Sequence, residues 1–389
     1  MWFCEREKIS EVEADLRAYF AWEIGKPLPG WIYDKLDMFP HLRRHACGFL
    51  SFLRTTTSSF NEQERSLYEL SERYGTGVYS KSKDEQEFYM YAQKGVTINL
   101  RAAVNCGFIK LTINLNSVLY AEPQRVVLFC PDKNYLGIFD RNLWEILRDA
   151  GLGGAEEFEF SRVDFSANAK VDDPLAYIAL ARKSGVPNGY QGTYPRFDNK
   201  KRNKPIKYAY SFDLTHNRED YAVTLYSKAD QLKDDRNAEL RDIQDAQGLL
   251  RFEAKYGAPM LKTYIGMHDL HYSKEKLYDL LSASPSVLRR AMCSCFPEGT
   301  YYSLPAARKQ LDRAAQSKQR ERLLKWIEET SRMNSACKAR RKLCEGLSFS
   351  QRAALMQFQR ESAINPVTIG RDWKRQSLPS LQEVFELET

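Results

Sequence analysis

The sequence predicts an α+β protein with a central, mainly antiparallel sheet, flanking helices and a basic helical C-terminal domain. Short runs rich in Val, Ile, Phe and Tyr recur between residues 87 and 256, and polar or Gly/Pro-containing connections separate many of them. Beyond about residue 273, helical periodicity and basic side chains replace this pattern. The 389 residues allow two or three domains, and an aromatic content of 12% excludes a wholly disordered chain.

The elements divide the chain into three expected parts. Residues 1–75 form an N-terminal helical segment, because apolar positions recur at helical spacing over 9–25 and 61–74. Residues 76–272 form the α+β domain, and residues 273–389 form the basic helical domain. The strands of the α+β domain are expected at 88–91, 96–100, 108–116, 125–129, 157–168, 207–214, 221–228 and 249–256, and its helices at 141–150 and 174–183.

Composition also bears on location. No run approaches the ~18 uncharged apolar residues of a membrane helix, and residues 5–8 are charged where a signal peptide is apolar. The eight cysteines include no CxxC pair. We therefore expect a soluble protein of a reducing compartment, with no membrane partner. Ordinary thiols explain Cys293, Cys295, Cys337 and Cys344 better than zinc does, because their spacing fits no four-ligand site.

Positive charge is concentrated in one segment. Residues 306–342 contain twelve basic and four acidic residues, a charge of +8 within a chain whose net charge is +7. Such a segment on a near-neutral body indicates a polyanion-binding surface, and Arg340, Arg341 and Lys342 are its densest cluster. The alternative is a solvated helix face that is crossed by ion pairs.

A second basic cluster lies in the loop at 196–207 and follows aromatic residues. Tyr190, Tyr194 and Phe197 offer rings for base stacking, and the cluster after them offers cations for phosphates. This combination suits single-stranded nucleic acid, although basic loops are common. The cluster consists of Lys200, Lys201, Arg202 and Lys204.

Three predicted strands place polar groups on one face each, since alternate side chains of a strand share a face. Arg162, Asp164 and Ser166 share a face in the first strand, and Thr224, Tyr226 and Lys228 do so in the second. Arg251, Glu253 and Lys255 share a face in the third. A half-buried sheet produces such alternation without any catalytic role, and the Arg-x-Asp and Arg-x-Glu patterns alone are compatible with a cross-strand ion-pair ladder.

Together, these groups suit phosphoryl transfer if the three polar faces lie on the same side. The phenol of Tyr226 is a candidate nucleophile, and Lys228 would favour its phenolate or neutralise the transition state. Asp164 and Glu253 are hard oxygen ligands for Mg²⁺ or Mn²⁺. The candidate DNA contacts near them are Arg162, Arg251 and Lys255.

At these residues the chain resembles the filamentous-phage replication initiators, the gene II and gene X replication proteins. That family carries Arg-hydrophobic-Asp, then Tyr-x-Lys, then Leu-x-Arg-x-Glu in this order, and here residues 161–167, 226–228 and 249–254 match. The resemblance covers roughly residues 95–265, and plasmid rolling-circle initiators share the order. It implies a Rep-nickase-like fold.

The resemblance also implies an activity. Such proteins nick one strand of a replication origin, become joined to the 5′ phosphate through a tyrosine, leave a 3′ hydroxyl primer and later reseal the strand. Tyr226 matches the family's nucleophile and Lys228 its neighbouring lysine. Implied partners are double- and single-stranded origin DNA with the host helicase, polymerase and single-strand-binding protein, in the bacterial cytoplasm. The His-hydrophobic-His pair of many nickases is missing, which leaves carboxylates as candidate ligands.

Two other functions compete with this interpretation. A non-catalytic, sequence-specific DNA-binding regulator of replication would explain the basic residues that lie outside the polar faces. A capsid or assembly protein ranks last, because it has no use for Tyr226 or Glu253.

Overall fold

The computed structural model describes residues 45–387 apart from gaps at 57–59, 83, 103–105, 130–131, 193–209, 217–219, 315 and 371–372. The helix expected over 9–25 lies outside these residues, and so do most residues of the basic loop. Within the described part of the chain, no helix is both long and apolar enough to cross a bilayer.

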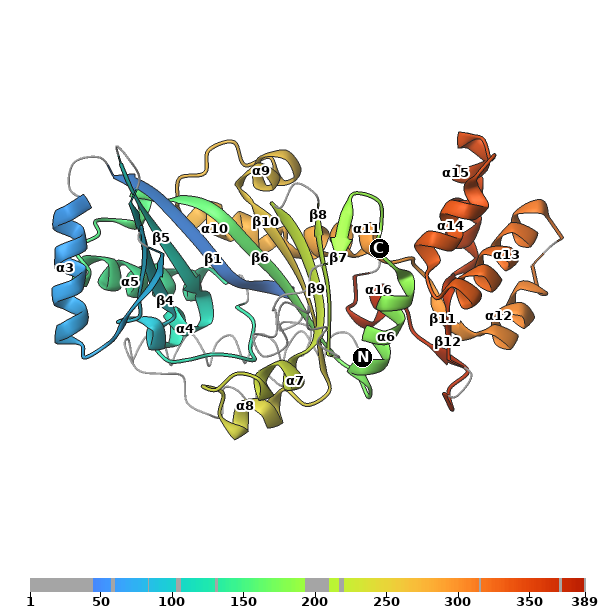
Figure 1. Cartoon of the computed structure of the whole chain (residues 1–389), viewed down its shortest axis with the longest axis horizontal. Coiled ribbons are helices and arrows are strands. Elements are labelled where there is room, and N and C mark those ends of the chain that lie inside the picture. The colour runs from blue at the N-terminus through green and yellow to red at the C-terminus, as the bar shows by residue number, and fades with distance from the viewer. Residues whose placement is uncertain are drawn as a thin grey trace, which may run out of the picture.

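A ten-stranded antiparallel sheet forms the body of the molecule and confirms the α+β class (Figure 1). Its spatial order is β2-β3-β4-β5-β1-β6-β10-β9-β8-β7. Neighbours in this order pair in antiparallel register. The strands are β1 (His45–Thr56), β2 (Val78–Ser82), β3 (Glu85–Phe88), β4 (Val96–Ala102), β5 (Gly107–Asn114), β6 (Glu159–Lys170), β7 (Tyr190–Gly192), β8 (Ser211–His216), β9 (Tyr221–Ser227) and β10 (Leu249–Gly257).

The expectation of a purely helical segment before residue 76 is wrong for its described part. β1 lies in the middle of the sheet, between β5 and β6. Helix α3 (Phe60–Arg73) does follow it where a helix was expected over 61–74. The sheet therefore recruits a strand from upstream of the expected domain boundary.

Two other elements differ from expectation. Residues 125–129 form an irregular segment instead of a strand, and Leu128 and Phe129 bury their side chains. The helix expected over 141–150 begins earlier, as α5 (Lys133–Asp149), because Asp132 accepts hydrogen bonds from the backbone N–H groups of Asn134 and Tyr135. Helix α6 (Pro174–Ser184) matches its expected range.

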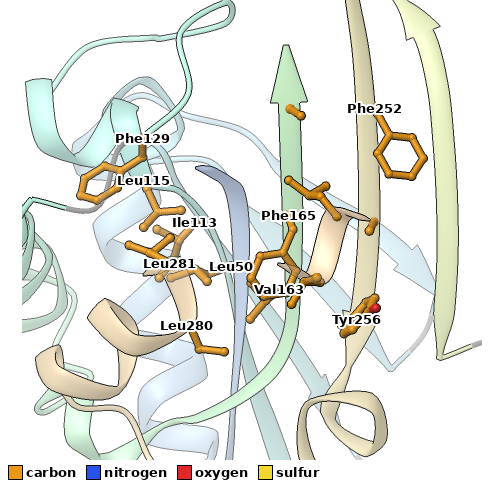
Figure 2. Close-up of a cluster of buried hydrophobic side chains, with 14 of the residues drawn as sticks. Leu50, Ile113, Leu115, Phe129, Val163, Phe165, Phe252, Tyr256, Leu280 and Leu281 are labelled. Carbon is orange, nitrogen blue, oxygen red and sulfur yellow. The ribbon is translucent and has the colours of Figure 1, made fainter. Parts of the chain in front are cut away.

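The apolar face of the sheet packs against helices from the C-terminal part of the chain. Val163 and Phe165 of β6 lie on this face near Leu280 and Leu281 of α10 (Lys274–Ser282), as Figure 2 shows. Phe252 of β10 contacts rings that follow α11 (Ser284–Cys295) and α16 (Leu381–Val384). The expected boundary at residue 273 therefore does not separate the two cores, since α10, α11 and α16 complete the first one.

A smaller unit lies beyond this body, at the right of Figure 1. Its helices enclose a second core around Leu323, Trp326 and Ile327. A three-stranded sheet in the order β12-β11-β13 accompanies them. The elements are β11 (Thr300–Ser303), α12 (Leu304–Leu311), α13 (Lys318–Met333), α14 (Ala336–Cys344), α15 (Phe349–Ser362), β12 (Ile364–Ile369) and β13 (Ser377–Leu378).

Candidate active site

The polar faces of the three motif strands lie on the same side of the sheet. In the register of β6, β10 and β9, Asn168 lies opposite Arg251, and Arg251 lies opposite Tyr226. Glu253 lies opposite Ser166 one step along. Residues directly opposite each other project to the same face, so the condition for a shared site is met.

Tyr226 and Glu253 are in direct contact. The Tyr226 hydroxyl donates a 2.7 Å hydrogen bond to Glu253 Oε1, and both side chains are buried, with Tyr226 8% exposed. Burial, the charge of Glu253 and this hydrogen bond raise the pKa of Tyr226 well above its ordinary value. The phenol is therefore neutral in this state and needs a proton acceptor in order to react.

Glu253 is ionised and is therefore able to accept that proton. Burial alone would raise its pKa, but the charges of Lys255 and Arg251, the Tyr226 hydroxyl and the charge of Lys228 together lower it. Glu253 Oε2 lies 3.8 Å from Lys255 Nζ. A buried carboxylate thus stays ionised beside the phenol because cations compensate its charge.

Arg162 and Asp164 form a bidentate ion pair within β6. Arg162 Nε and Nη2 donate to the two carboxylate oxygens of Asp164 at 2.6 and 2.7 Å. The Arg162 side chain is 43% exposed, whereas that of Asp164 is 5% exposed. Burial raises the pKa of Asp164 despite this partner. Arg162 and Asp164 therefore form an ion pair along one strand, and not the cross-strand ladder that was the alternative for this motif.

Lys228 does not continue the polar face of β9, and that expectation is wrong. The strand ends at Ser227, and Lys228 is the first residue of α7 (Lys228–Lys233). Its ammonium donates to Gln231 Oε1 at 2.8 Å. Burial and the nearby charge of Arg251 lower the pKa of Lys228 to about 7.

A short segment, which we call the strap (Gln124–Val127), crosses the polar face over Arg251. The Arg251 guanidinium donates to the Val126 carbonyl, and the Asn168 side-chain amide donates to the same oxygen at 3.2 Å. The amide of Asn114 in β5 donates to the Gln124 carbonyl at 3.0 Å. Because Tyr226 lies directly opposite Arg251, the strap helps to explain the burial of the phenol.

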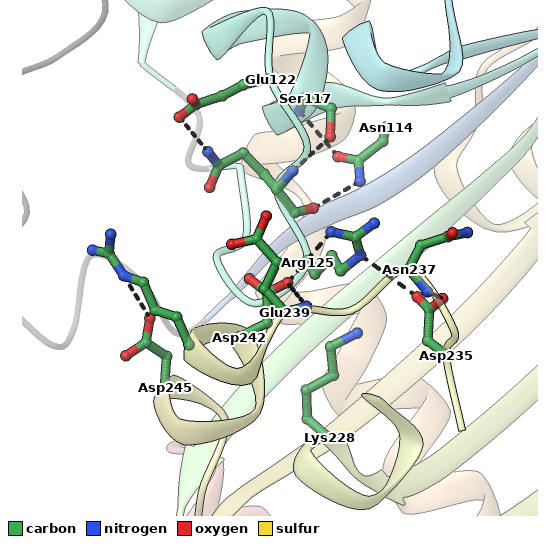
Figure 3. Close-up of polar contacts among 12 residues, drawn as sticks. Asn114, Ser117, Glu122, Arg125, Lys228, Asp235, Asn237, Glu239, Asp242 and Asp245 are labelled. Atoms are coloured by element: carbon green, nitrogen blue, oxygen red, sulfur yellow. Dashed lines mark hydrogen bonds and ion pairs between the residues drawn. The ribbon is translucent and has the colours of Figure 1, made fainter. Parts of the chain in front are cut away.

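Arg125 fastens the strap to the loop after α7 and to the next helix. Its guanidinium lies 3.5 Å from Asp235 Oδ2 and 3.3 Å from Asp242 Oδ2. Figure 3 shows both ion pairs, with Lys228 in the same corner of the molecule. Asp242 belongs to α8 (Leu240–Asp245). Residues 125–127 of the strap belong to the segment that was expected to be a strand.

One carboxylate of the same face was not singled out from the sequence. Asp213 of β8 lies opposite Thr224 and accepts a 2.8 Å hydrogen bond from Ser211 Oγ. Burial raises its pKa, and its charge interacts with those of Lys255 and Glu253. The position of Asp213 in an expected strand, two residues after Ser211, was the available signal.

Carboxylate oxygens on this face are of the type that a hard divalent cation prefers, but their present geometry is less suited to such a cation. Mg²⁺ commonly binds one or two carboxylates and completes its shell with water and substrate phosphate. Asp164 and Glu253 interact electrostatically across the face, but both already have partners. Among the described residues, no three His, Cys, Asp or Glu side chains are arranged to hold a metal.

The remaining candidate DNA contacts are differently placed. Lys200, Lys201, Arg202 and Lys204 lie outside the described residues. In α14, Arg341 and Lys342 are exposed, whereas Arg340 is half-buried and lines a cavity beside the end of α11. Arg341 donates to Asn188 Oδ1 at 2.8 Å.

Ion pairs use part of the charge in residues 306–342, as the alternative for this segment expected. Arg308 pairs with Glu328, and Arg320 pairs with Asp312. Glu329 pairs with two bases. Other bases of the segment are exposed, namely Lys309, Lys318, Lys325 and Lys338.

Comparison with known proteins does not establish a family for this chain. No protein-family model matches the chain. No curated protein matches it either. A solved structure titled as a rolling circle replication initiator protein from Geobacillus stearothermophilus is similar over 65% of this chain and 85% of its own, with 11% identity and a TM-score of 0.33. These values are too low to establish a shared fold, so no functional conclusion is taken from that protein.

Proposed function

We propose that this protein is a rolling-circle replication initiator that nicks and rejoins one DNA strand through Tyr226. The observation that carries the proposal is the buried 2.7 Å hydrogen bond from Tyr226 to Glu253, on the sheet face that also holds Asp164, Arg162 and Lys255. The order of the three motifs along the chain, which resembles that of the phage initiators, supports the same conclusion.

The proposed reaction is a transesterification at phosphorus. The Tyr226 oxygen forms a bond to the scissile phosphorus while its proton passes to Glu253 Oε1, and the bond from phosphorus to the 3′ oxygen breaks. The 3′ oxygen takes a proton and becomes the primer hydroxyl, and the 5′ phosphate stays on Tyr226. Attack by a 3′ hydroxyl reverses these steps and reseals the strand without an external energy source.

Positive side chains on the same face would stabilise the transition state. Arg162 and Lys255 have exposed fractions of 43% and 33%, so both can reach a phosphate on the open part of the face. Arg251 is 4% exposed and is held by Asn168 and the strap. Its proposed contribution is to compensate the charge of Glu253.

A divalent cation is part of the proposal. Asp164 and Glu253 are the residues that would hold Mg²⁺ or Mn²⁺, together with phosphate oxygens of the DNA. The ion would withdraw negative charge from the scissile phosphate. The exposed bases of the smaller C-terminal unit would bind double-stranded origin DNA, and the host replication proteins would then act on the nicked template.

The proposal is tested by detecting a covalent adduct between the protein and DNA. Supercoiled plasmids carrying fragments of the replicon that encodes this chain are incubated with the protein and Mg²⁺, and protein-linked DNA is separated under denaturing conditions. Mass spectrometry of the attached peptide should identify Tyr226, and Tyr226→Phe should abolish the adduct.

Tyr221→Phe is the matched control for this test. Tyr221 lies on the same strand and is also buried, but its ring packs against Tyr256 instead of Glu253. The Tyr221→Phe variant should nick normally. An adduct that forms at the normal rate with Tyr226→Phe contradicts the assignment of the nucleophile.

The burial of Tyr226 favours a second candidate, a non-catalytic DNA-binding regulator. A phenol that is only 8% exposed cannot reach DNA unless the residues around it move. This candidate predicts specific origin binding without any protein-linked 5′ end, so the same adduct assay separates the two functions.

A further inference from the structure

An aromatic side chain stands on the polar face beside the candidate site. Phe49 of β1 lies directly opposite Asp164 of β6 on one side and Asn114 of β5 on the other. It is 38% exposed, whereas the next residue, Leu50, and Phe52 are fully buried on the other face. β1 thus places one large ring among polar groups, outside its apolar face.

Two cationic side chains lie on the same sheet face as this ring. Arg162, whose side chain is 43% exposed, lies two residues before Asp164 on the adjacent strand. Lys255, with a side chain that is 33% exposed, lies opposite Asp164 on the next strand. Aromatic rings on a sheet surface stack on unpaired bases, and neighbouring cations bind the phosphates between them.

We propose that Phe49, with Arg162 and Lys255, forms a stacking subsite for an unpaired base of the DNA strand. The subsite rests on the proposed function and extends it, because it implies that the DNA next to the nick is single-stranded. Phe49 supplies affinity for a base of any identity, since every base has a π face.

The position of the subsite fits a strand that also reaches Tyr226. Three strand spacings and four residues along the sheet separate Phe49 from Tyr226, which amounts to roughly 20 Å. A stacked strand rises ~3.4 Å per nucleotide, so a base on Phe49 would lie within about six nucleotides of the scissile phosphate.

Binding of two probes tests the subsite. The first probe is a 20-nucleotide oligo(dT), and the second is a 20-unit strand of abasic sugar phosphates with the same charge and no bases. Both are measured by fluorescence anisotropy with full-length protein that carries Tyr226→Phe, so that no cleavage interferes. Phe49→Ala should weaken binding of oligo(dT) roughly 5- to 100-fold and leave binding of the abasic strand unchanged.

Two further variants sharpen this test. Phe49→Trp keeps a stacking ring and should retain the preference for oligo(dT). Phe349→Ala makes the same chemical change at a residue of α15 that is 88% exposed, and it should leave both affinities unchanged. The salt dependence of binding should be the same with and without Phe49, because stacking releases no counterions.

The outcomes separate the subsite from the proposed nickase activity. Equal weakening of both probes by Phe49→Ala, or no weakening of either, overturns the subsite whether or not an adduct forms. Conversely, selective loss of oligo(dT) binding in a protein whose wild type forms no adduct supports the subsite and contradicts the nickase.

Discussion

Replacing Glu253 with Gln tests both roles proposed for this residue, as the proton acceptor for Tyr226 and as a ligand of the cation. The variant keeps an oxygen near the Tyr226 hydroxyl, which now lies 2.7 Å from Glu253 Oε1, but an amide does not accept a proton at neutral pH. A positioned general base contributes about 10²- to 10⁴-fold in rate, which corresponds to roughly 3–5.5 kcal/mol in the barrier. We therefore expect adduct formation by Glu253→Gln to slow by that factor.

The same substitution also removes a buried negative charge. Lys255, Arg251 and Lys228 all interact with Glu253, so the variant leaves their charges less compensated. Removal of one partner from a buried ion pair costs about 3–5 kcal/mol, and folding must be verified by circular dichroism and thermal unfolding. Rates are compared only at temperatures at which the variant remains folded.

Asp213→Asn is the matched control for this experiment. It makes the same kind of change on the same sheet face, but Asp213 contacts Ser211 instead of Tyr226. The assay is single-turnover formation of the protein–DNA adduct across pH 5–8. Near-normal rates for folded Glu253→Gln, or equal losses in both variants, would refute the assignment of Glu253 as the proton acceptor.

Three other predictions follow from charge. Burial lowers the pKa of Lys228 from the ordinary lysine value of 10.5 to about 7 in the folded protein, so its burial costs stability below pH 7, and the cost is relieved as pH rises to about 10.5. Lys228→Met should therefore raise the free energy of unfolding, measured in urea, by a few kcal/mol near pH 6 and by less near pH 10. The gain is at most about 1.4 kcal/mol for each pH unit that separates the folded and unfolded pKa values. A gain that is independent of pH would contradict this prediction. Chelation of the metal with EDTA should stop nicking. Asp164→Asn should raise the Mg²⁺ concentration that is needed for the half-maximal rate at least several-fold. Nicking that is unaffected by EDTA would exclude a role for the metal. Arg341→Ala and Lys342→Ala should each reduce the slope of log affinity against log salt for duplex DNA by about 1, whereas half-buried Arg340→Ala should change it less; unchanged slopes would remove α14 from the interface.

The sequence was informative where side-chain alternation is local. Alternation placed Tyr226, Glu253 and Asp164 on the polar faces of their strands, and the register of β6, β10 and β9 confirms that these faces coincide. It failed at Lys228, because the chain turns into α7 immediately after Ser227. A local pattern does not reveal where a strand ends when the next residue begins a helix with a buried side chain.

Other failures have equally specific causes. β1 was missed because Phe49 and Leu53 interrupt its polar side, so that the run from Phe49 to Leu53 shows no clean alternation. The segment 125–129 has the composition of a strand, but Leu128 and Phe129 are buried in the body of the protein. Its carbonyl groups accept hydrogen bonds from side chains instead of forming a ladder: Val127 from Asn116, and Val126 from Arg251.

Taken alone, the amino-acid order determined which groups each strand offers to its polar face, because the two-residue period of a strand depends only on neighbouring residues. Tertiary structure decided that Glu253 contacts Tyr226 and that the strap binds Arg251, which lies opposite Tyr226. These relations depend on which strands become neighbours and on what crosses them. Long-range packing sets both, through contacts between residues far apart in the chain.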